Sequence, residues 1–234
     1  MLLPSSSLTG FLLIVGFCNV SGIDIHERQA DLIRCIDLSE SLREARLAGY
    51  TVAEYYTIRN SRFSRPAEAR VEARYRRGEG VTYRVQSRSG PSLLNRALDR
   101  LLQEESQMSR GRAREQAVIT SANYNMKPLG REVVNGTLCA VLDLTPKRRS
   151  PYLLKGRLWV NAADIKVVKI EGKPPTSPSF FTGRPEIVRQ YKQVDGFALA
   201  ELSHAVSRSF LFGQSTVDIE YRDYHIVTSR GSHH

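Results

Sequence analysis

The stretch from Gly136 to Gly172 decides the fold, and it reads GTLCAVLDLTPKRRSPYLLKGRLWVNAADIKVVKIEG. Residues 138 to 144 alternate as a strand with one well-covered face does. One side is uniformly apolar and the other is mixed; the apolar side holds Leu138, Ala140, Leu142 and Leu144. Pro146 cannot donate to a strand ladder, so this strand should end at Thr145-Pro146.

Two further strands follow within the same stretch. Leu154, Leu158 and Val160 share one face of the second strand, and Lys155, Arg157 and Trp159 share the other. Asn161 to Asp164 is a natural turn, and the β-branched run 165 to 171 returns as the third strand. The stretch therefore predicts a three-stranded antiparallel meander at the centre of a sheet.

The chain before the meander predicts two helices with strands between them. Residues 23 to 48 show the periodic apolar side of a helix that Gly49 could end. Strands are expected at 50–59, 71–76 and 81–88, with a hairpin at Gly78-Glu79-Gly80. Glu54 interrupts the apolar alternation of the first of these strands.

The second helix is the clearest of the chain. Ser92 can cap it, and its apolar residues recur at i, i+3, i+4, i+7 and i+8; they are Leu94, Ala97, Leu98, Leu101 and Leu102. This stripe fits core packing, or a cover over a hydrophobic cavity. Glu104-Glu105 is expected on the exposed face of the helix, and residues 110 to 114 are expected to form a basic turn.

A proline-rich loop at 173–185 carries two adjacent aromatic residues, Phe180 and Phe181. Such residues either fasten a loop to the core or line a ligand opening. Strands are expected again from Glu186 to Ile226, so strands greatly outnumber helices. At 234 residues and 41% hydrophobic, the chain is long enough for one large domain, expected to span residues 23–234.

The net charge of +10 is the strongest bulk feature. It fits a solvated basic surface, attraction to an anionic membrane surface, or nucleic-acid binding. Because the basic residues are dispersed rather than gathered, nucleic acid is the least favoured partner.

The first 22 residues carry no charge and centre on the apolar run 11–15, as the core of a signal peptide does. Cleavage near Gly22 would release a periplasmic protein, although the usual positive start of a signal peptide is missing. Cys18 raises lipidation as an alternative, but the bulky Phe17 before it is unlike a lipidation site. The run is too short to span a bilayer.

Cys35 and Cys139 would remain in the exported chain. They could pair in an oxidising compartment, or both could be buried free thiols. Neither has the spacing of a metal site. No catalytic set, phosphate loop or dinucleotide fingerprint is present, so the sequence predicts a protein that is not an enzyme and needs no cofactor or metal.

The order of elements resembles the periplasmic LolA/LolB-like superfamily, which includes outer-membrane lipoprotein-sorting proteins and the RseB/MucB-type regulators. The resemblance spans residues 23 to 226 and is strongest at the motif Leu144-Thr145-Pro146-Lys147 and at Trp159-Val160. It implies an α+β fold, a strongly curved antiparallel sheet forming an incomplete β-barrel whose open, concave side is covered by helices.

The resemblance also implies a cavity that takes lipid acyl chains or a lipoprotein. The expected ligand-binding residues are Leu94, Leu98, Leu101, Trp159, Phe180 and Phe181, the leucines forming the removable cover and the phenylalanines the entrance. The alternative is an RseB-type envelope sensor that binds another envelope protein and carries no lipid. An exported hydrolase is a third, weaker hypothesis.

Overall fold

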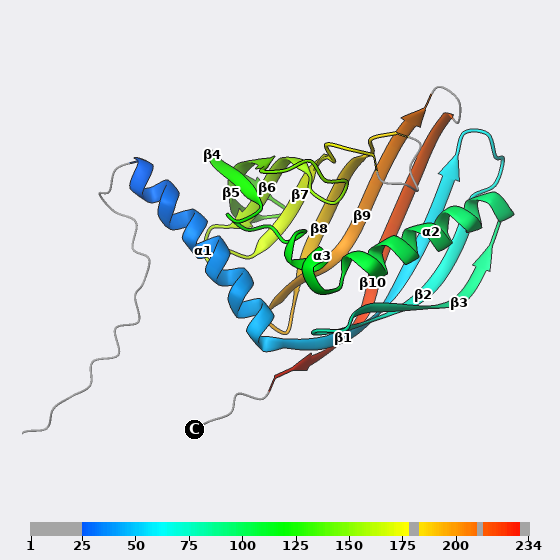
Figure 1. Cartoon of the computed structure of the whole chain (residues 1–234), viewed down its shortest axis with the longest axis horizontal. Coiled ribbons are helices and arrows are strands. Elements are labelled where there is room, and N and C mark those ends of the chain that lie inside the picture. The colour runs from blue at the N-terminus through cyan, green and yellow to red at the C-terminus, as the bar shows by residue number, and fades with distance from the viewer. Residues whose placement is uncertain (1–24, 178–182, 210–212, 230–234) are drawn as a thin grey trace, which may run out of the picture.

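The computed structural model describes residues 25–177, 183–209 and 213–229 (Figure 1). The helices are α1 (Ile25–Arg46), α2 (Ser92–Met108) and α3 (Gly111–Glu115). The strands are β1 (Leu47–Asn60), β2 (Ala67–Arg76), β3 (Gly80–Ser89), β4 (Tyr124–Val134), β5 (Thr137–Pro146), β6 (Lys155–Asn161), β7 (Val167–Lys173), β8 (Glu186–Val194), β9 (Phe197–Ser209) and β10 (Gly213–Thr228).

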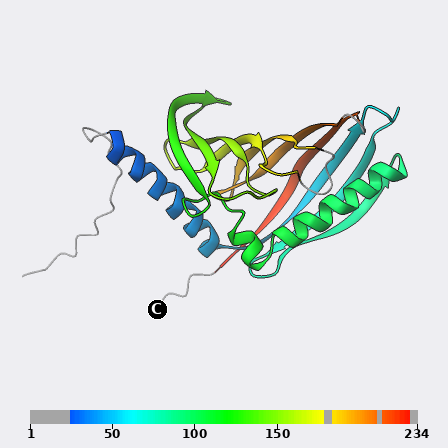
Figure 2. The ribbon, with the colours of Figure 1, turned by 45° about the horizontal axis from the view of Figure 1, so that its top comes forward.

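All ten strands form one antiparallel sheet in the order β3-β2-β1-β10-β9-β8-β7-β6-β5-β4. Strand β1 pairs with both β2 and β10, so the first and last strands are neighbours. Strands β3 and β4 are the two edges, and the sheet is therefore not closed into a barrel. The sheet is curved, and α1 and α2 lie on its hollow side (Figures 1 and 2). The predicted fold class is confirmed.

The register of the strands places one continuous row of paired residues across the sheet from β1 to β5. The paired residues on it are Tyr56 with Ile219, Ile219 with Ser203, Ser203 with Arg189, Arg189 with Ile170, Ile170 with Leu158, and Leu158 with Leu142. Cross-strand partners point the same way, so these side chains share a face. This is the concave face, since residues from both helices pack on it.

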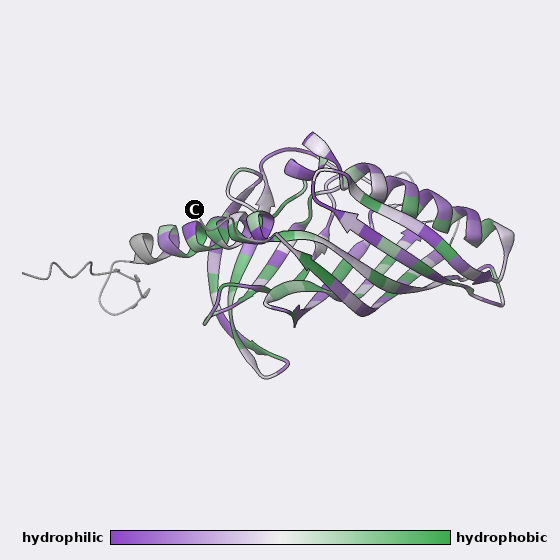
Figure 3. Cartoon of the chain, turned by 90° about the horizontal axis from the view of Figure 1, so that it is seen from below, coloured by the Kyte–Doolittle hydropathy of each residue, from purple (hydrophilic) through white to green (hydrophobic). Residues whose placement is uncertain are grey.

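The two largest apolar cores of the concave face lie under different helices. The α2-side core joins leucines of α2 to strand residues that include Val52, Tyr56, Val71, Val217 and Ile219. The α1-side core joins Ile36 of α1 to Tyr124, Met126, Leu142, Leu144, Leu153, Leu158, Val160 and Ile170. The banded hydropathy of the strands in Figure 3 reflects the alternation between this face and the other.

The predicted meander is confirmed as β5, β6 and β7. The Asn135-Gly136 turn before it has φ angles of 47° and 78°, which suit these residue types in a two-residue hairpin. The turn after β6 is held by Asn161, whose side-chain oxygen accepts a hydrogen bond from the Ala163 N–H at 2.9 Å.

Three local predictions were wrong. Helix α1 ends at Arg46 and leads directly into β1, so Gly49 lies in a strand; a Cβ there would come within 2.7 Å of the Tyr75 carbonyl oxygen. Pro91 rather than Ser92 is the N-cap of α2, without a side-chain cap bond. Residues 111 to 115 form the short helix α3 instead of a basic turn.

The predicted Cys35–Cys139 pairing is also corrected. Cys139 is a fully buried free thiol that packs with Val141 and Trp159. These residues occupy the odd positions of β5 and β6, whereas α1 packs against the even ones, such as Leu142 and Leu158. The sheet therefore separates Cys139 from α1, the helix that carries Cys35.

Candidate ligand-binding face

The leucine stripe of α2 covers half of the concave face. Its buried residues are Leu94, Leu98, Leu101 and Leu102, with Leu98 only 1% exposed. They pack in the α2-side core with Tyr56 of β1 and Val71 of β2. The helical repeat of the sequence produces this face, and the curvature of the sheet gives it a hollow to fill.

The polar contacts of α2 run along β3, the strand that precedes it. Ser106 Oγ donates to the Val81 carbonyl at 2.8 Å, and Asn95 Nδ2 donates to the Ser89 carbonyl at 3.2 Å. Asp99 pairs with Arg88 at 3.0 Å. One side of α2 is thus fastened to the edge strand from end to end.

On its other side α2 is held to the sheet by one ion pair. Glu105 Oε1 lies 3.8 Å from Arg189 Nη2 of β8. Within the part of the chain that the structure describes, no other polar contact joins α2 to a strand other than β3. The two side chains are 28% and 35% exposed, so water weakens this pair. Glu105 Oε2 also accepts a hydrogen bond from Tyr83 Oη at 3.0 Å.

A group of polar side chains surrounds this ion pair. We call it the polar centre, and it consists of Glu54, Tyr56, Tyr83, Glu105, Arg189 and Tyr221. Tyr56 Oη donates to Glu54 Oε2 at 2.6 Å. Arg189 Nε donates to Ser203 Oγ at 3.5 Å, and Tyr221 lies within electrostatic reach of both glutamates and of the arginine.

Glu54 is the most deeply buried carboxyl group of the polar centre, at 5% exposed. Burial, followed by the negative charge of Glu105, raises its pKa to about 8. At neutral pH Glu54 is therefore mostly protonated, and the charges of the polar centre are those of Glu105 and Arg189.

The polar centre offers groups that can bind a ligand. Its cation, carboxyl groups and phenol hydroxyls supply hydrogen bonds in the middle of an apolar face, as ligand sites commonly do. No group of three or more His, Cys, Asp or Glu positioned to hold a metal ion occurs among residues 25–177, 183–209 and 213–229.

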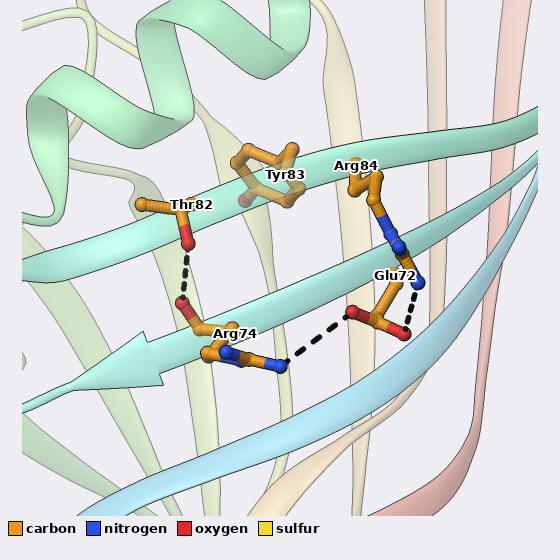
Figure 4. A pocket seen from close by; sticks show the side chains of 5 residues that line it. All are labelled: Glu72, Arg74, Thr82, Tyr83 and Arg84. Atoms are coloured by element: carbon orange, nitrogen blue, oxygen red, sulfur yellow. Dashed lines mark hydrogen bonds and ion pairs between the residues drawn. The ribbon is translucent and has the colours of Figure 1, made fainter.

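Two depressions of the surface lie on the opposite, convex face. One of about 340 Å³ is lined by Glu72, Arg74, Thr82 and Arg84, and also by Tyr83, whose hydroxyl donates to Glu105 on the concave side. Figure 4 shows Glu72 linked to both arginines. The other, of about 330 Å³, includes His204, whose ring nitrogen lies 2.6 Å from Asp218 Oδ1. Their linings are rich in charged side chains that pair with one another, so neither is suited to an acyl chain.

The structure brings some of the predicted site residues together and separates others. Leu94, Leu98 and Leu101 share the concave face. Trp159 lies on the convex face, because it occupies an odd position of β6; its Nε1 donates to Glu132 Oε2 at 2.8 Å and Lys169 Nζ lies 4.3 Å from its ring centroid. Phe180 and Phe181 lie outside the described residues.

The residues of the motif Leu144-Thr145-Pro146-Lys147 shape the end of β5. Leu144 is fully buried in the α1-side core, and Pro146 ends β5 as expected. Thr145 Oγ1 donates to Asp143 Oδ2 at 3.2 Å, and the Lys147 N–H donates to the Asn123 carbonyl at 2.9 Å. These contacts fix the end of β5 beside the start of β4.

Sequence reasoning missed the polar centre. Glu105 was predicted on an exposed helix face, which is wrong, since it points toward Tyr83 and Arg189. One signal was present: Glu54 stands at an inward position of a strand whose other inward residues are apolar. A charged residue at such a position is expected to have partners. The hydrogen bond to Glu54 comes from Tyr56 of the same strand, and the charges near it belong to Glu105 of α2 and Arg189 of β8.

No family model matches the chain, and no curated protein matches it by sequence. Among solved structures, a domain from Vibrio parahaemolyticus that is named for outer membrane lipoprotein sorting shares 13% identity with a TM-score of 0.50, covering 88% of this chain and 95% of its own. The chain shares the fold of this lipoprotein-sorting domain. The resemblance stated from the sequence is thus confirmed at the level of the fold.

A LolA superfamily protein from Nitrosomonas europaea gives 12% identity and a TM-score of 0.47 over 86% of this chain and 94% of its own. None of the helices within the described residues is both long enough and apolar enough to cross a membrane.

Proposed function

We propose that the protein is a non-enzymatic envelope protein that binds the acyl chains of a lipid or lipoprotein on the concave face beneath α2. The observation that carries this proposal is the attachment of α2. The helix is fastened along β3, while its other side is held by leucine packing and one partly exposed ion pair. Such a helix can turn about β3 and uncover the α2-side core. The lipoprotein-sorting fold supports the same assignment.

The energies make an exchange of α2 for a ligand feasible. Exposing the four buried leucines of α2 would cost about 1.5 to 3 kcal/mol each. An acyl chain gains about 0.8 kcal/mol for each CH₂ group that it buries, so a chain of about 16 carbons gains about as much as the leucines lose. A shorter chain gains proportionally less and should displace the helix less readily.

Phe180 and Phe181 are proposed to line the entrance to this face. If they do, replacing both with alanine weakens the binding of a fluorescent fatty acid and leaves the melting temperature nearly unchanged. If they are core residues instead, the same change lowers stability by about 3 to 5 kcal/mol for each residue. Unchanged fatty-acid binding at full stability would also reject the entrance role.

We further propose that residues 1 to 22 form a signal peptide and that the protein acts in the periplasm. The expected product begins near Ile23 and fractionates with periplasmic proteins. Intact-mass measurement checks this, and a cytosolic protein that retains Met1 would overturn it.

The direct test is lipid analysis of the protein purified without detergent. Mass spectrometry should detect acyl lipid bound in near-stoichiometric amount to the wild-type protein. Lipid-free protein that also fails to bind added fatty acid would exclude the proposed function.

A second candidate function is recognition of another envelope protein. It is favoured by three exposed apolar side chains on the hairpin of β4 and β5: Leu129 is 50%, Val133 is 69% and Leu138 is 47% exposed. Val133 and Leu138 are cross-strand partners beside the free edge of the sheet. This function would be favoured over the first if the wild type, purified without bound lipid, captures an envelope protein and the Val133→Thr/Leu138→Thr variant does not.

A further inference from the structure

The polar centre contains one cation whose charge partner belongs to the part that is proposed to move. Arg189 stands on β8, a strand of the sheet, whereas the carboxylate that faces it belongs to Glu105 of α2. If α2 turns away about β3, Glu105 leaves with it and Arg189 stays.

We infer that Arg189 is the anion-binding residue of the concave face, where the carboxylate or phosphate of an acyl ligand takes the place of the Glu105 carboxylate. This inference rests on the proposed function and adds to it the chemical class of the ligand. The ligand is an acyl chain with an anionic head, such as a fatty acid or an anionic phospholipid, rather than a neutral glyceride.

Electrostatics favours the replacement. When α2 moves, the Arg189 guanidinium loses the Glu105 carboxylate, and a ligand anion in its place restores a charge-assisted contact. Glu54 supplies little of this charge at neutral pH, because burial raises the Glu54 pKa to about 8 and keeps the group mostly protonated. The ligand is therefore the expected source of the replacement anion.

The surroundings of Arg189 also fit an anionic head group. Its side chain is 35% exposed, so solvent and solutes reach it without unfolding the sheet. The Tyr83 hydroxyl now donates to Glu105, and it would lose that acceptor when α2 moves. A guanidinium and a phenol O–H are both donors, and together they bind carboxylate or phosphate oxygens.

The position of Arg189 sets the direction of the acyl chain. The apolar residues Ala205, Val217 and Ile219 lie on the same face beside it and belong to the α2-side core. A head group at Arg189 thus places the chain over the surface that the α2 leucines now cover.

The experiment compares four single-chain probes that share an oleoyl or oleyl chain. Oleate carries a carboxylate, 1-oleoyl lysophosphatidate carries a phosphate, and monoolein and oleyl alcohol are neutral. Affinities are measured by calorimetry on the delipidated full chain at pH 7, below the micelle concentration of each probe. The wild type should bind both anionic probes at least about tenfold more tightly than the neutral ones.

Arg189→Gln should reduce this preference to within about twofold while leaving the affinity for the neutral probes in place. Arg208→Gln is the matched control, since Arg208 is an exposed arginine of the next strand on the convex face, and it should keep the preference. If Arg189→Gln folds poorly, the double variant Arg189→Gln/Glu105→Gln removes both charges and should show the same loss. Glu105→Gln alone should strengthen binding of the anionic probes.

The outcomes separate this inference from the function on which it rests. Equal affinity of the wild type for charged and neutral probes, or an unchanged preference in Arg189→Gln, overturns the role of Arg189 and leaves acyl binding standing. Binding of no probe at all overturns both. A preference confined to oleate or to the lysophosphatidate identifies the head group, carboxylate or phosphate, that the site accepts.

Discussion

The two halves of the concave face are covered in different ways. The α1-side core is closed mainly by the sheet and by the connection between β5 and β6, since Leu142, Leu144, Leu153, Leu158 and Val160 are all fully buried. Helix α1 contributes Ile36, which is 4% exposed, and the partly buried Leu32 and Ile33, and it leaves Leu38 and Leu42 more than half exposed. The α2-side core, by contrast, takes four of its buried residues from α2 itself.

This difference indicates which half is fixed and which can open. Moving α1 would uncover the part of its core that Leu32, Ile33 and Ile36 cover, whereas moving α2 would uncover a broader apolar surface that needs another occupant. The ionisable groups of the polar centre lie beside the α2-side core, since Tyr56 and Tyr221 belong to both. A ligand with an apolar chain and a polar head is therefore expected in the α2 half.

The largest effect is expected from Leu98→Ala in α2. Leu98 is 1% exposed, and the lost contacts and the cavity should lower the free energy of unfolding by about 2 to 5 kcal/mol. Leu93→Ala on the same helix is the control, because Leu93 is 58% exposed and should cost less than about 0.5 kcal/mol. Urea unfolding measures both. Equal effects would mean that α2 is not part of the core.

A second effect concerns the pH dependence of stability and Glu54. Its folded pKa of about 8 lies above its unfolded value, so the folded state holds the proton more strongly. The stability from this group is fully present below about pH 4.5 and is lost as the pH rises through about 8. Glu54→Gln should flatten that decline and raise stability at pH 8 by roughly 1 to 3 kcal/mol.

Thermal unfolding between pH 5 and pH 9 checks this effect. Glu79→Gln, at an exposed position of the β2–β3 hairpin, is the control and should keep the decline. A Glu54→Gln protein that remains as pH-dependent as the wild type would show that Glu54 is ionised in the folded state.

Labelling of the Cys139 thiol tests whether this residue lies on the face of the sheet opposite to α1. Its thiol should resist labelling in the native protein, because it is fully buried, and should label completely in denatured protein that was never reduced. Peptide mapping identifies the labelled residue. A denatured, unreduced protein in which Cys139 stays unlabelled would restore the disulfide hypothesis.

The smallest effect is expected at Trp159. Trp159→Phe loses the hydrogen bond to Glu132 and weakens the contact with Lys169, which should cost about 1 kcal/mol. Acyl binding should stay unchanged, because this side chain lies on the convex face. As the only tryptophan of the chain, it should also keep its fluorescence when ligand binds. A large spectral shift would place the ligand near the convex face.

Local signals in the sequence predicted much of the fold. The alternation over residues 138 to 144 and the Asn135-Gly136 turn act within a few residues of one another, so a hairpin is specified without reference to the rest of the chain. The leucine repeat of α2 is similarly local. The pairing of β1 with β10 is not specified locally, because it joins residues such as Tyr56 and Ile219 that are far apart in sequence.

The candidate site was less predictable for the same physical reason. Glu105 and Arg189 meet only because β8 lies under the free side of α2, and no local pattern gives that placement. Trp159 was assigned to the ligand because it stands in the motif region, but the pleat turns odd positions of β6 to the convex face. The boundary between α1 and β1 depends on how closely β2 approaches the backbone at Gly49, and the sequence alone does not reveal this distance.

The most direct test of the account measures whether α2 moves when ligand binds. Spin labels at Gln103 of α2 and Arg208 of β9, both exposed, report the distance across the α2 half in a chain whose native cysteines are replaced by alanine. Labels at Arg84 of β3 and Arg208 form the control pair, which does not involve α2. Saturating oleate should lengthen the first distance and leave the second unchanged. An unchanged first distance with oleate demonstrably bound would contradict the account.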